Sequence, residues 1–354
     1  MGGHMKIGMA INYSGDFAET IDNLIDFEKV GLDRITVPEA YSFDAVSQLG
    51  YIAARTSTIE LATGILPMYS RTPTNLAMTA AGLDYISGGR FVLGIGASGP
   101  QVIEGFHGVK YDAPVGRARE NAEICRMVWR RERTEYNGKY YKLPFSKEDG
   151  GTGLGKPLKI INHPVRERIP MLLAAIGPKN VELAAELFEE WQPILFHPEH
   201  LSVAFGDALD KGNAKRAPEL GKLGISVNTT ALITDDEEQR QNALALVKHH
   251  AALYIGGMGA RGKNFYNDLA VRYGYADAAK EIQDLYLDGK KQEAAAAVPD
   301  DLASGMSLIG PASFVKERLA AFESAGITTL LVAPATPGHA DQVEQIRLLK
   351  EFVS

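Results

Sequence analysis

The stretch ELATGILPMYSRTP, residues Glu60–Pro73, decides the fold of this chain. It begins as an apolar run and then breaks at Gly64 and Pro67, before an aromatic residue, Arg71 and a second proline. An apolar run that ends in a corner marked by glycine and proline is typical of a buried parallel strand at its carboxyl end. In parallel α/β folds, ligands bind at these carboxyl ends. The stretch therefore predicts a strand that ends in a ligand-binding corner.

On both sides of this corner, short apolar runs alternate with segments of helical spacing. Eight strands are expected, at residues 6–11, 34–37, 60–65, 91–95, 169–174, 192–196, 223–233 and 328–332. Helices with 3.6-residue spacing lie between them. Short strand–helix connections imply right-handed βαβ units and a parallel sheet. Eight such units in 354 residues favour a (β/α)8 TIM barrel, of the α/β class, over an open sheet.

Two segments interrupt the alternation, and we expect both to be insertions in a single domain at residues 5–354. The first covers about residues 132–165, is rich in glycine and tyrosine, and carries a predicted hairpin near Asn137-Gly138. The second covers about residues 255–310 and is first glycine-rich, then helical and alanine-rich. Residues 1–4 are interpreted as the remnant of an expression tag.

Composition excludes several classes of function. Net charge is −7, which argues against nucleic acid because phosphate binding needs a basic face. The chain shows no apolar run of roughly 18 residues and no signal-peptide pattern before Met5, so we expect no membrane association. A single cysteine, Cys125, excludes an internal disulfide and fits the reducing cytoplasm. An anionic ligand must therefore be held by local donors.

In a barrel, all strand exits face one rim, so residues far apart in the sequence are expected to meet there. The exits are Asn12-Tyr13, Glu39–Tyr41, Gly64–Arg71, Gly96–Gln101, Ala175–Asn180 and His197–His200. We find no serine nucleophile elbow, no Schiff-base lysine and no pair of carboxylates around a sugar-sized gap. Glycines, amides and aromatic residues line the exits instead. Such a lining suits a cofactor that performs the chemistry, and we expect a flat, flavin-like ring on the Gly64 corner.

Gly94–Gly99 matches the pattern GxGxxG after a strand, so a dinucleotide-binding motif has to be considered. The motif lies in the fourth strand–helix unit, and residues 115–120, where the ribose-binding acid would fall, have the pattern of a helix start. We favour a strand–helix loop in which Ser98, Gly99 and their small neighbours let the backbone approach a ligand.

Two other segments are candidate anion sites. The residues that open one predicted helix are Ala175, Ile176, Gly177, Pro178, Lys179 and Asn180. Free backbone amides at a helix start form an anion cradle, and Lys179 adds charge. An ordinary helix start with proline in its first turn is the alternative. Arg261 and Lys263 in the second insertion either grip an anionic tail or form a solvated loop.

The histidines carry different predictions. His197 and His200 have a spacing that can ligate metal, but no acidic or thiol partner completes a site, so we predict no metal. His249 and His250 are expected on a helix surface. His107 follows the fourth strand exit and is the best candidate for proton transfer, with a structural loop histidine as the alternative.

Four stretches together resemble one known family over nearly the whole chain. They are Thr63–Pro67, Ser87–Phe91 continuing through Gly105–Gly108, Ala175–Asn180 and Tyr254–Gly259. The sequence is similar to the luciferase-like flavin-dependent superfamily and, within it, to the branch that uses the deazaflavin coenzyme F420. Each stretch alone is weak evidence for this family, whereas the four stretches together are specific for it. The resemblance implies an enzyme with a TIM barrel and a deazaflavin cofactor.

The resemblance also assigns roles. It implies a non-prolyl cis peptide at Gly64–Ile65 that backs the deazaflavin ring, with Leu66 beside it, and an acidic residue, Glu39, that faces the ring. Phosphate and tail contacts fall on Ile176–Asn180, and Arg71 is a guess from position alone. We expect Glu39 and His107 to handle protons while a hydride passes to or from a small-molecule substrate. A homodimer is implied as well.

One departure and two alternatives stand beside this reading. Relatives have Asp-Gly-Trp where this chain has Glu189-Glu190-Trp191, so the helix exit there is expected to differ. An FMN-dependent monooxygenase fed by a separate reductase is the first alternative. The second is a non-catalytic deazaflavin-binding protein. The substrate cannot be read from the sequence, because the insertions have no transferable code.

Overall fold

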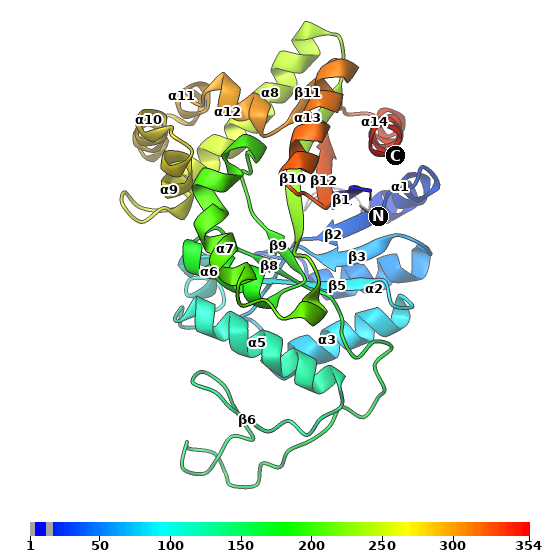
Figure 1. Ribbon diagram of the computed structural model, residues 1–354, viewed down its shortest axis with the longest axis vertical. Coiled ribbons are helices and arrows are strands. Elements are labelled where there is room, and N and C mark those ends of the chain that lie inside the picture. Colours follow the sequence, from blue (N-terminus) through cyan, green and yellow to red (C-terminus); the bar gives the residue numbers. More distant parts are fainter. Residues whose placement is uncertain (1–3, 12–16) are drawn as a thin grey trace.

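The computed structural model describes residues 4–11 and 17–354. Parallel strands close into a barrel in the order β1-β2-β3-β5-β8-β9-β10-β12 and back to β1 (Figure 1). This closed barrel confirms the predicted (β/α)8 fold. Its strands are β1 (Lys6–Ala10), β2 (Arg34–Val37), β3 (Glu60–Thr63), β5 (Phe91–Gly96), β8 (Met171–Ala174), β9 (Glu190–Gln192), β10 (Gly224–Ile233) and β12 (Thr329–Pro334).

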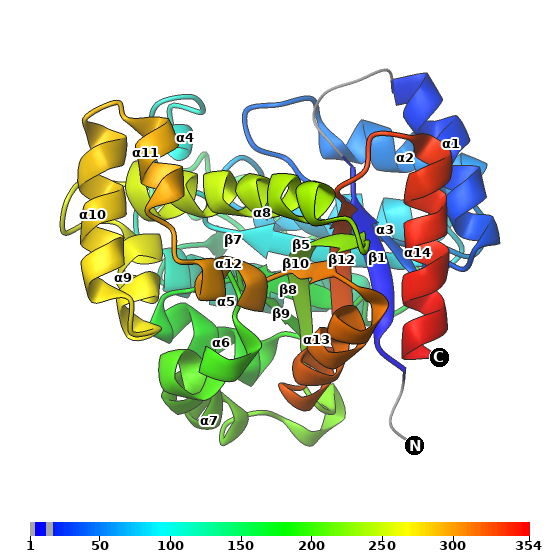
Figure 2. The same cartoon turned by 90° about the horizontal axis from the view of Figure 1, so that it is seen from above.

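Helices surround the barrel and begin where the sequence offers caps. Asp44 accepts a hydrogen bond from Ser47 N at the start of α2, and Thr72 accepts one from Asn75 N at the start of α3. Seen from above, α8 crosses over the strands, with α14 beyond one end of it (Figure 2). The longer helices are α1 (Phe17–Lys29), α2 (Ala45–Arg55), α3 (Pro73–Ile86), α5 (Pro114–Trp129), α6 (Pro178–Leu187), α8 (Glu237–Ala252), α13 (Ala312–Ser324) and α14 (His339–Val353).

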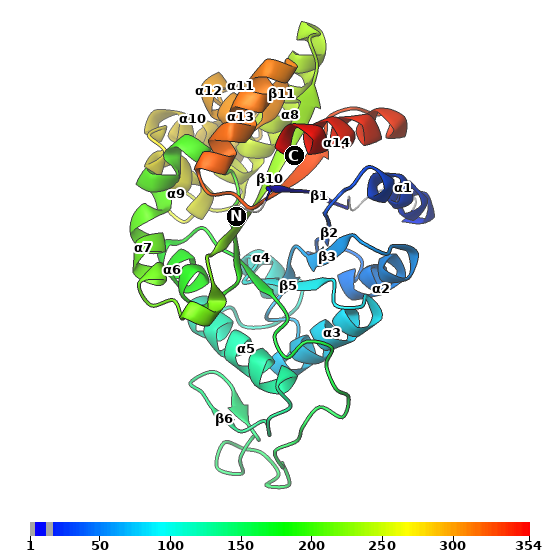
Figure 3. The same cartoon turned by 45° about the vertical axis from the view of Figure 1, so that its right-hand side comes forward.

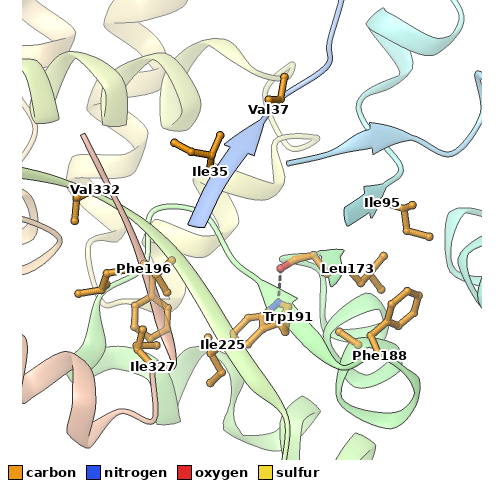
Figure 4. Close-up of a cluster of buried hydrophobic side chains, with 14 of the residues drawn as sticks. Ile35, Val37, Ile95, Leu173, Phe188, Trp191, Phe196, Ile225, Ile327 and Val332 are labelled. Carbon is orange, nitrogen blue, oxygen red and sulfur yellow. Dashed lines mark hydrogen bonds between the residues drawn. The ribbon is translucent and has the colours of Figure 1, made fainter. Parts of the chain in front are cut away.

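The apolar core includes side chains from strands on opposite sides of the barrel and from the segments that follow them. Figure 4 shows Trp191 among Ile35, Leu173 and Phe188, all of them buried. The Trp191 indole N–H donates to the carbonyl of Ala175 at 2.8 Å, so its one polar atom is satisfied inside the core. This bond ties β9 to the exit of β8.

An ionic cluster fills the barrel interior near the amino ends of the strands. Arg34 on β2 is 1% exposed, and its guanidinium donates to Glu60 at 2.6 Å and to both oxygens of Glu190 at 2.6 Å. Lys6 adds a contact to Glu60 at 3.2 Å. Barrel interiors are commonly filled by branched apolar residues, so here paired charges take that role. The pairing matters because a buried charge without a partner is strongly destabilising.

The sixth barrel strand lies earlier than the sequence predicts. We expected residues 192–196, whereas β9 covers Glu190–Gln192. Glu190 belongs to the strand, since it pairs with Leu172 on β8 and with Gly224 on β10, and its carboxylate reaches Arg34 inside the barrel. Leu195 has φ of +51°, which ends the extended conformation before Phe196. The departure at Glu189-Glu190-Trp191 therefore supplies an interior ligand for Arg34.

The first insertion contains the predicted hairpin, formed by β6 (Tyr136–Asn137) and β7 (Lys142–Leu143). It extends away from the barrel at the bottom of Figures 1 and 3. The short helices elsewhere are α4 (Pro100–Ile103), η1 (Pro198–His200), η2 (Ser202–Gly206), α7 (Asp207–Asn213) and η3 (Pro218–Leu220).

The second insertion is largely helical, as predicted, and adds one strand that the sequence does not predict. Its strand β11 (Leu308–Gly310) pairs with the carboxyl half of β10, where β9 no longer accompanies that strand. Among the described residues, no helix combines the length and apolar character needed to cross a bilayer. The other elements of this insertion are η4 (Leu253–Gly257), α9 (Phe265–Arg272), α10 (Ala276–Leu287), α11 (Lys291–Ala296) and α12 (Asp300–Gly305).

Candidate functional site

The corner after β3 forms as a sharp break in the strand. The Gly64–Ile65 peptide bond is cis, as the family resemblance implies. The chain then resumes as β4 (Leu66–Pro67), which pairs with β5 through Leu66 and Ile95. A Cβ atom on Gly64 would lie 2.1 Å from the Thr36 methyl group, so only glycine fits this position.

Small residues surround Ile65 at the carboxyl end of the barrel interior. A Cβ atom on Gly96 would lie 3.1 Å from Ile65 Cδ1 and 3.5 Å from the Ala174 methyl group. Nearby, the Thr36 hydroxyl is buried and has no hydrogen-bond partner. A buried polar atom without a partner is rare and calls for an explanation. A shelf of small residues beside an unpartnered hydroxyl has the chemistry of a site for a flat, polar-edged ligand.

Glu39 follows β2 and is held from two sides. Its carboxylate oxygens lie 2.5 Å and 3.0 Å from the Arg71 guanidinium nitrogens. One of them also accepts from Ala45 N at 2.9 Å, at the start of α2. Glu39 and Asp44 together raise the pKa of Arg71 against the effect of its burial. Arg71, a guess from position alone in the sequence, thus joins the exit of β2 to the corner after β4.

The exit of β5 carries Ser98, Gly99 and His107. Ser98 has a positive φ of 55°, and its carbonyl accepts a weak hydrogen bond from the Tyr111 hydroxyl at 3.5 Å. The Nε2 atom of His107 is buried and has no hydrogen-bond partner. Both roles predicted for His107, proton transfer and a structural loop histidine, therefore stay open.

The segment 175–180 opens helix α6 after β8. Gly177 is the N-cap and supplies no side-chain hydrogen bond, and Pro178 occupies the first turn. The Asn180 side-chain oxygen is buried without a partner, whereas Lys179 is exposed. An uncapped helix start with a lysine beside it is suited to an anionic group. From the second insertion, Arg272 donates to the carbonyl of Ile176 at 3.1 Å.

These segments come together because β2, β3, β5 and β8 are consecutive neighbours in the barrel. Arg261 does not join them through its charge, since its guanidinium binds Asp284 at 2.8 Å within the second insertion. Asn12 and Tyr13, which were also expected at the rim, lie outside the described residues.

His250 was expected on a helix surface, and it lies exposed on α8, as predicted. The sequence analysis did not predict its contact with Tyr254. Its ring lies 4.8 Å from that of Tyr254, which in turn lies 4.8 Å from Tyr266. The spacing of four residues between His250 and Tyr254 is the signal that could have revealed this contact.

His197 and His200 form a separate aromatic pair, with ring centroids 4.3 Å apart. His197 is buried, and its Nδ1 atom lies 3.0 Å from a Glu199 oxygen without forming an aligned hydrogen bond. Within residues 4–11 and 17–354, no group of three His, Cys, Asp or Glu side chains is arranged to hold a metal ion.

A cavity of about 700 Å³ lies between α8 and α14, away from every predicted site residue. One of its polar side chains is already engaged, since the Gln345 amide accepts from Ile233 N at 2.7 Å and donates to Ile233 O at 3.2 Å. We therefore place the candidate site at the carboxyl-terminal rim of the barrel.

The chain belongs to the luciferase-like monooxygenase family, whose model matches residues 5–329. A Mycobacterium tuberculosis protein, provisionally named a coenzyme F420-dependent oxidoreductase, is 39% identical over 352 residues, covering 98% of this chain and 99% of the relative. The 5,10-methylenetetrahydromethanopterin reductase of Archaeoglobus fulgidus is 27% identical over 334 residues, covering 92% of each.

Solved structures share the fold. The coenzyme F420-dependent tetrahydromethanopterin reductase of Methanopyrus kandleri has a TM-score of 0.77 at 22% identity, covering 99% of this chain and 100% of its own. The EDTA monooxygenase of Chelativorans has a TM-score of 0.72 at 16% identity, with coverages of 99% and 95%. The expected luciferase-like architecture is confirmed.

Proposed function

We propose that this protein is a coenzyme F420-dependent oxidoreductase that transfers a hydride between the deazaflavin and a small organic substrate. The observation that carries the proposal is the shelf of Gly64, Gly96 and Ala174 around Ile65, next to the unpartnered Thr36 hydroxyl. The relative at 39% identity, whose name includes this cofactor, supports the same choice.

The described residues fit a deazaflavin. Its ring would rest on Gly64, Ile65 and Leu66, with the Thr36 hydroxyl at the polar edge. The Ser98-Gly99 backbone, at the exit of the neighbouring strand β5, would border the ring as well. Its phosphate would meet the uncapped start of α6 at residues 176–180, whose backbone N–H groups would donate to it. Arg261 would reach the tail only by leaving Asp284.

When bound, the deazaflavin supplies two-electron hydride chemistry. The chain itself would position the reactants and move protons. His107 is the proton carrier in this proposal, because its Nε2 atom has no partner within the described structure. Glu39 would be a positioning residue, since its carboxylate is already bound by Arg71 and by Ala45 N at the start of α2. Replacement His107→Ala should slow turnover while F420 affinity stays unchanged.

A homodimer is part of the proposal. Helices α2 and α3 pack side by side and expose large apolar side chains on their outer faces. The most exposed are Tyr85 at 70% and Met78 at 58%, followed by Ile86 at 52% and Tyr51 at 47%. Exposed apolar residues gathered on one face favour association with a second copy. Sedimentation velocity tests this, and a monomer at micromolar concentration would contradict it.

The alternative is an FMN-dependent monooxygenase, favoured by the description of the family and by the monooxygenases among the structural neighbours. Equilibrium titration with F420 and with FMN, followed by protein fluorescence, separates the two. We expect micromolar or tighter binding of F420 and at least tenfold weaker binding of FMN. The reverse order would replace the proposal with the alternative.

A further inference from the structure

Arg272 joins the second insertion to the exit of β8. It lies in the last turn of α9, and its guanidinium donates to the carbonyl of Ile176 at 3.1 Å and to that of Ala204 at 2.7 Å. Ile176 comes directly before Gly177, the N-cap of α6. Helix α9 packs on η2, just before α7, and Figures 1 and 3 both show it beside α7. The guanidinium therefore lies next to the start of α6.

The Arg272 side chain is held firmly in this place. Its guanidinium lies over the Phe205 ring, 5.2 Å from the ring centroid, and Phe205 is 2% exposed. Phe205 in turn packs edge to face on Trp191, in the core of the barrel. The next residue, Tyr273, is buried, and its hydroxyl donates to the carbonyl of Leu195 at 3.0 Å. Arg272 is therefore a fixed part of the rim.

The charge of Arg272 has no counter-ion among residues 4–11 and 17–354. Its hydrogen bonds go to two carbonyl oxygens, which leaves other N–H groups of the guanidinium unbonded within these residues. Burial lowers the pKa of the guanidinium, and the nearby Tyr273 and Asp268 offset this effect only in part. A cation that is partly removed from water without an ion-pair partner is costly, so its position calls for an anion.

Two other partly buried arginines also bond only uncharged groups, but helix ends supply the negative charge that they need. Arg90 donates to the carbonyl of Ala53 at 3.2 Å, at the end of α2, and Arg216 donates to the carbonyl of Phe188 at 2.7 Å, at the end of α6. The carboxyl end of a helix carries a partial negative charge, which stabilises a cation. Arg272 reaches past the end of its own helix to a carbonyl beside the amino end of α6, where the partial charge is positive. These surroundings favour an added anion.

The start of α6 offers a place for such an anion. The N–H groups of Gly177 and Lys179 donate to no acceptor in the part of the chain that the structure describes, whereas those of Asn180 and Val181 donate to the Gly177 carbonyl. A Cβ atom on Gly177 would meet nothing within 4 Å, and its φ of −72° is open to any residue. Neither the backbone nor the packing of the chain therefore requires glycine here. Open space beside free amides suits an oxyanion.

The sequence predicted two other cations as anion ligands, and both are less suited to this place. Lys179 is exposed, so water and salt screen its charge. Arg261 is bound to Asp284 at 2.8 Å within the second insertion. Arg272, which the sequence analysis did not single out, is fixed, partly shielded from water and next to the free amides.

We propose that Arg272 is the cation of a phosphate subsite at the start of α6, so that the second insertion forms one wall of the cofactor site. Bonds between a guanidinium and phosphate oxygens are charge-assisted and stronger than bonds between neutral groups. This inference rests on the proposed function, since it assigns the phosphate of the deazaflavin to Arg272 and to the amides of Gly177 and Lys179.

Paired titrations of the full chain, followed by protein fluorescence, isolate the contribution of the phosphate. One ligand is F420, and the other is its deazaflavin core without phosphate or tail. Arg272→Gln removes the charge but keeps an amide that can donate to a carbonyl. We expect this variant to weaken F420 at least about tenfold and the core less than about twofold. Equal weakening of both ligands would show that Arg272 only supports the fold of the rim, and would overturn the proposal.

A second replacement tests whether charge is the cause. Arg272→Lys keeps the charge and should bind F420 within about threefold of the wild type. Raising the salt concentration from about 50 mM to about 500 mM should weaken F420 less in Arg272→Gln than in the wild type, because the variant has lost the charge that salt screens. An Arg272→Lys variant as weak as Arg272→Gln, or equal salt dependence in Arg272→Gln and the wild type, would overturn the proposal.

Arg216→Gln is the matched control, because it also removes a partly buried arginine that bonds carbonyls of α6, at the other end of that helix. It should lower stability and leave the ratio of the F420 and core affinities unchanged. A ratio that changes as much as in Arg272→Gln would overturn the proposal. If Arg272→Gln fails to fold by circular dichroism, Arg272→His replaces it. The ratio should then be larger at pH 6, where the imidazole gains charge, than at pH 8, and an equal ratio would overturn the proposal.

The titrations also separate this inference from the proposed function. Unchanged F420 binding in Arg272→Gln would overturn the inference and leave the proposed function intact. If the wild type does not bind F420, the proposed function fails, and FMN compared with riboflavin then tests Arg272 in the same way. If neither cofactor binds, about 20 mM inorganic phosphate should still raise the melting temperature of the wild type, and not that of Arg272→Gln, relative to chloride at equal ionic strength. No difference between the two proteins would overturn the inference.

Discussion

Arg71 and Glu39 form a two-pronged ion pair, with Nη1–Oε1 at 2.5 Å and Nη2–Oε2 at 3.0 Å. The pair joins the exit of β2 to the corner that follows β4. Because Glu39 also accepts from Ala45 N, three segments of the rim share one carboxylate. The side chains are only 9% and 14% exposed, so the pair is largely shielded from water.

Breaking this pair should destabilise the protein. Arg71→Met leaves the Glu39 carboxylate buried without its cation, and we expect the free energy of unfolding to fall by about 2–4 kcal/mol. Urea denaturation measures the change. Arg347→Met removes an exposed ion pair on α14 and should cost less than about 1 kcal/mol. Equal effects of the two replacements would show that the rim pair is no more than a surface contact.

The ionic cluster inside the barrel allows a second stability test. Glu190→Gly introduces the glycine that the family resemblance implies at this position and removes two 2.6 Å contacts from the buried Arg34. We expect a loss of about 3–5 kcal/mol by chemical denaturation, because Arg34 keeps only Glu60. The double variant with Arg34→Met should recover part of the loss. A single variant as stable as the wild type would contradict a structural role for Glu190.

Two threonines at the rim provide a matched pair for cofactor binding. Thr36→Val removes a buried hydroxyl without a partner, so stability should stay equal or rise, while F420 affinity should fall about three- to tenfold. Thr63→Val removes a hydroxyl bonded to the Gly94 carbonyl at 2.8 Å and to its N–H at 2.9 Å. This variant should lose about 1–3 kcal/mol of stability. Unchanged F420 affinity in Thr36→Val would remove the hydroxyl from the proposed site.

His197 should make stability depend on pH. Burial and the neighbouring His200 lower the pKa of His197 from 6.5 to about 4. As pH falls below 6.5, the unfolded chain binds a proton that the folded chain excludes, so stability is lost progressively until about pH 4. The contribution is about 2 kcal/mol between pH 6.5 and 5.

The measurement is urea denaturation at pH 7.5, 6 and 5. His197→Gln should flatten the decline in stability relative to the wild type, while His249→Gln, which replaces an exposed histidine, should retain it. A wild-type slope in the His197→Gln variant would show that another group causes the decline.

Strand–helix alternation predicts the barrel well, because each strand is a short apolar run bounded by turn residues. The same pattern fails at β9, because this short strand is not an apolar run. Glu190 places its carboxylate inside the barrel, and Trp191 is the buried apolar residue of the strand. The interior partner of Glu190 is Arg34, 156 positions away, and no local spacing reveals such a contact. The strand β11 is missed for a related reason, since its three residues depend on β10 for pairing.

In the candidate site, too, the features set by local sequence could be predicted, whereas contacts between distant residues could not. Glycine and proline at residues 64–67 and 175–180 identify the rim, because their backbone requirements are local. The contact of His250 with Tyr254 is local, because the two residues lie four positions apart at the end of α8. The contact of Tyr254 with Tyr266 forms only when the second insertion folds back on that helix end.

A crystal structure of the protein with F420 tests the central claim most directly. We predict the deazaflavin ring on Gly64, Ile65 and Leu66, with its phosphate at the start of α6. A ring in the cavity between α8 and α14, or with its phosphate away from residues 176–180, would contradict the account.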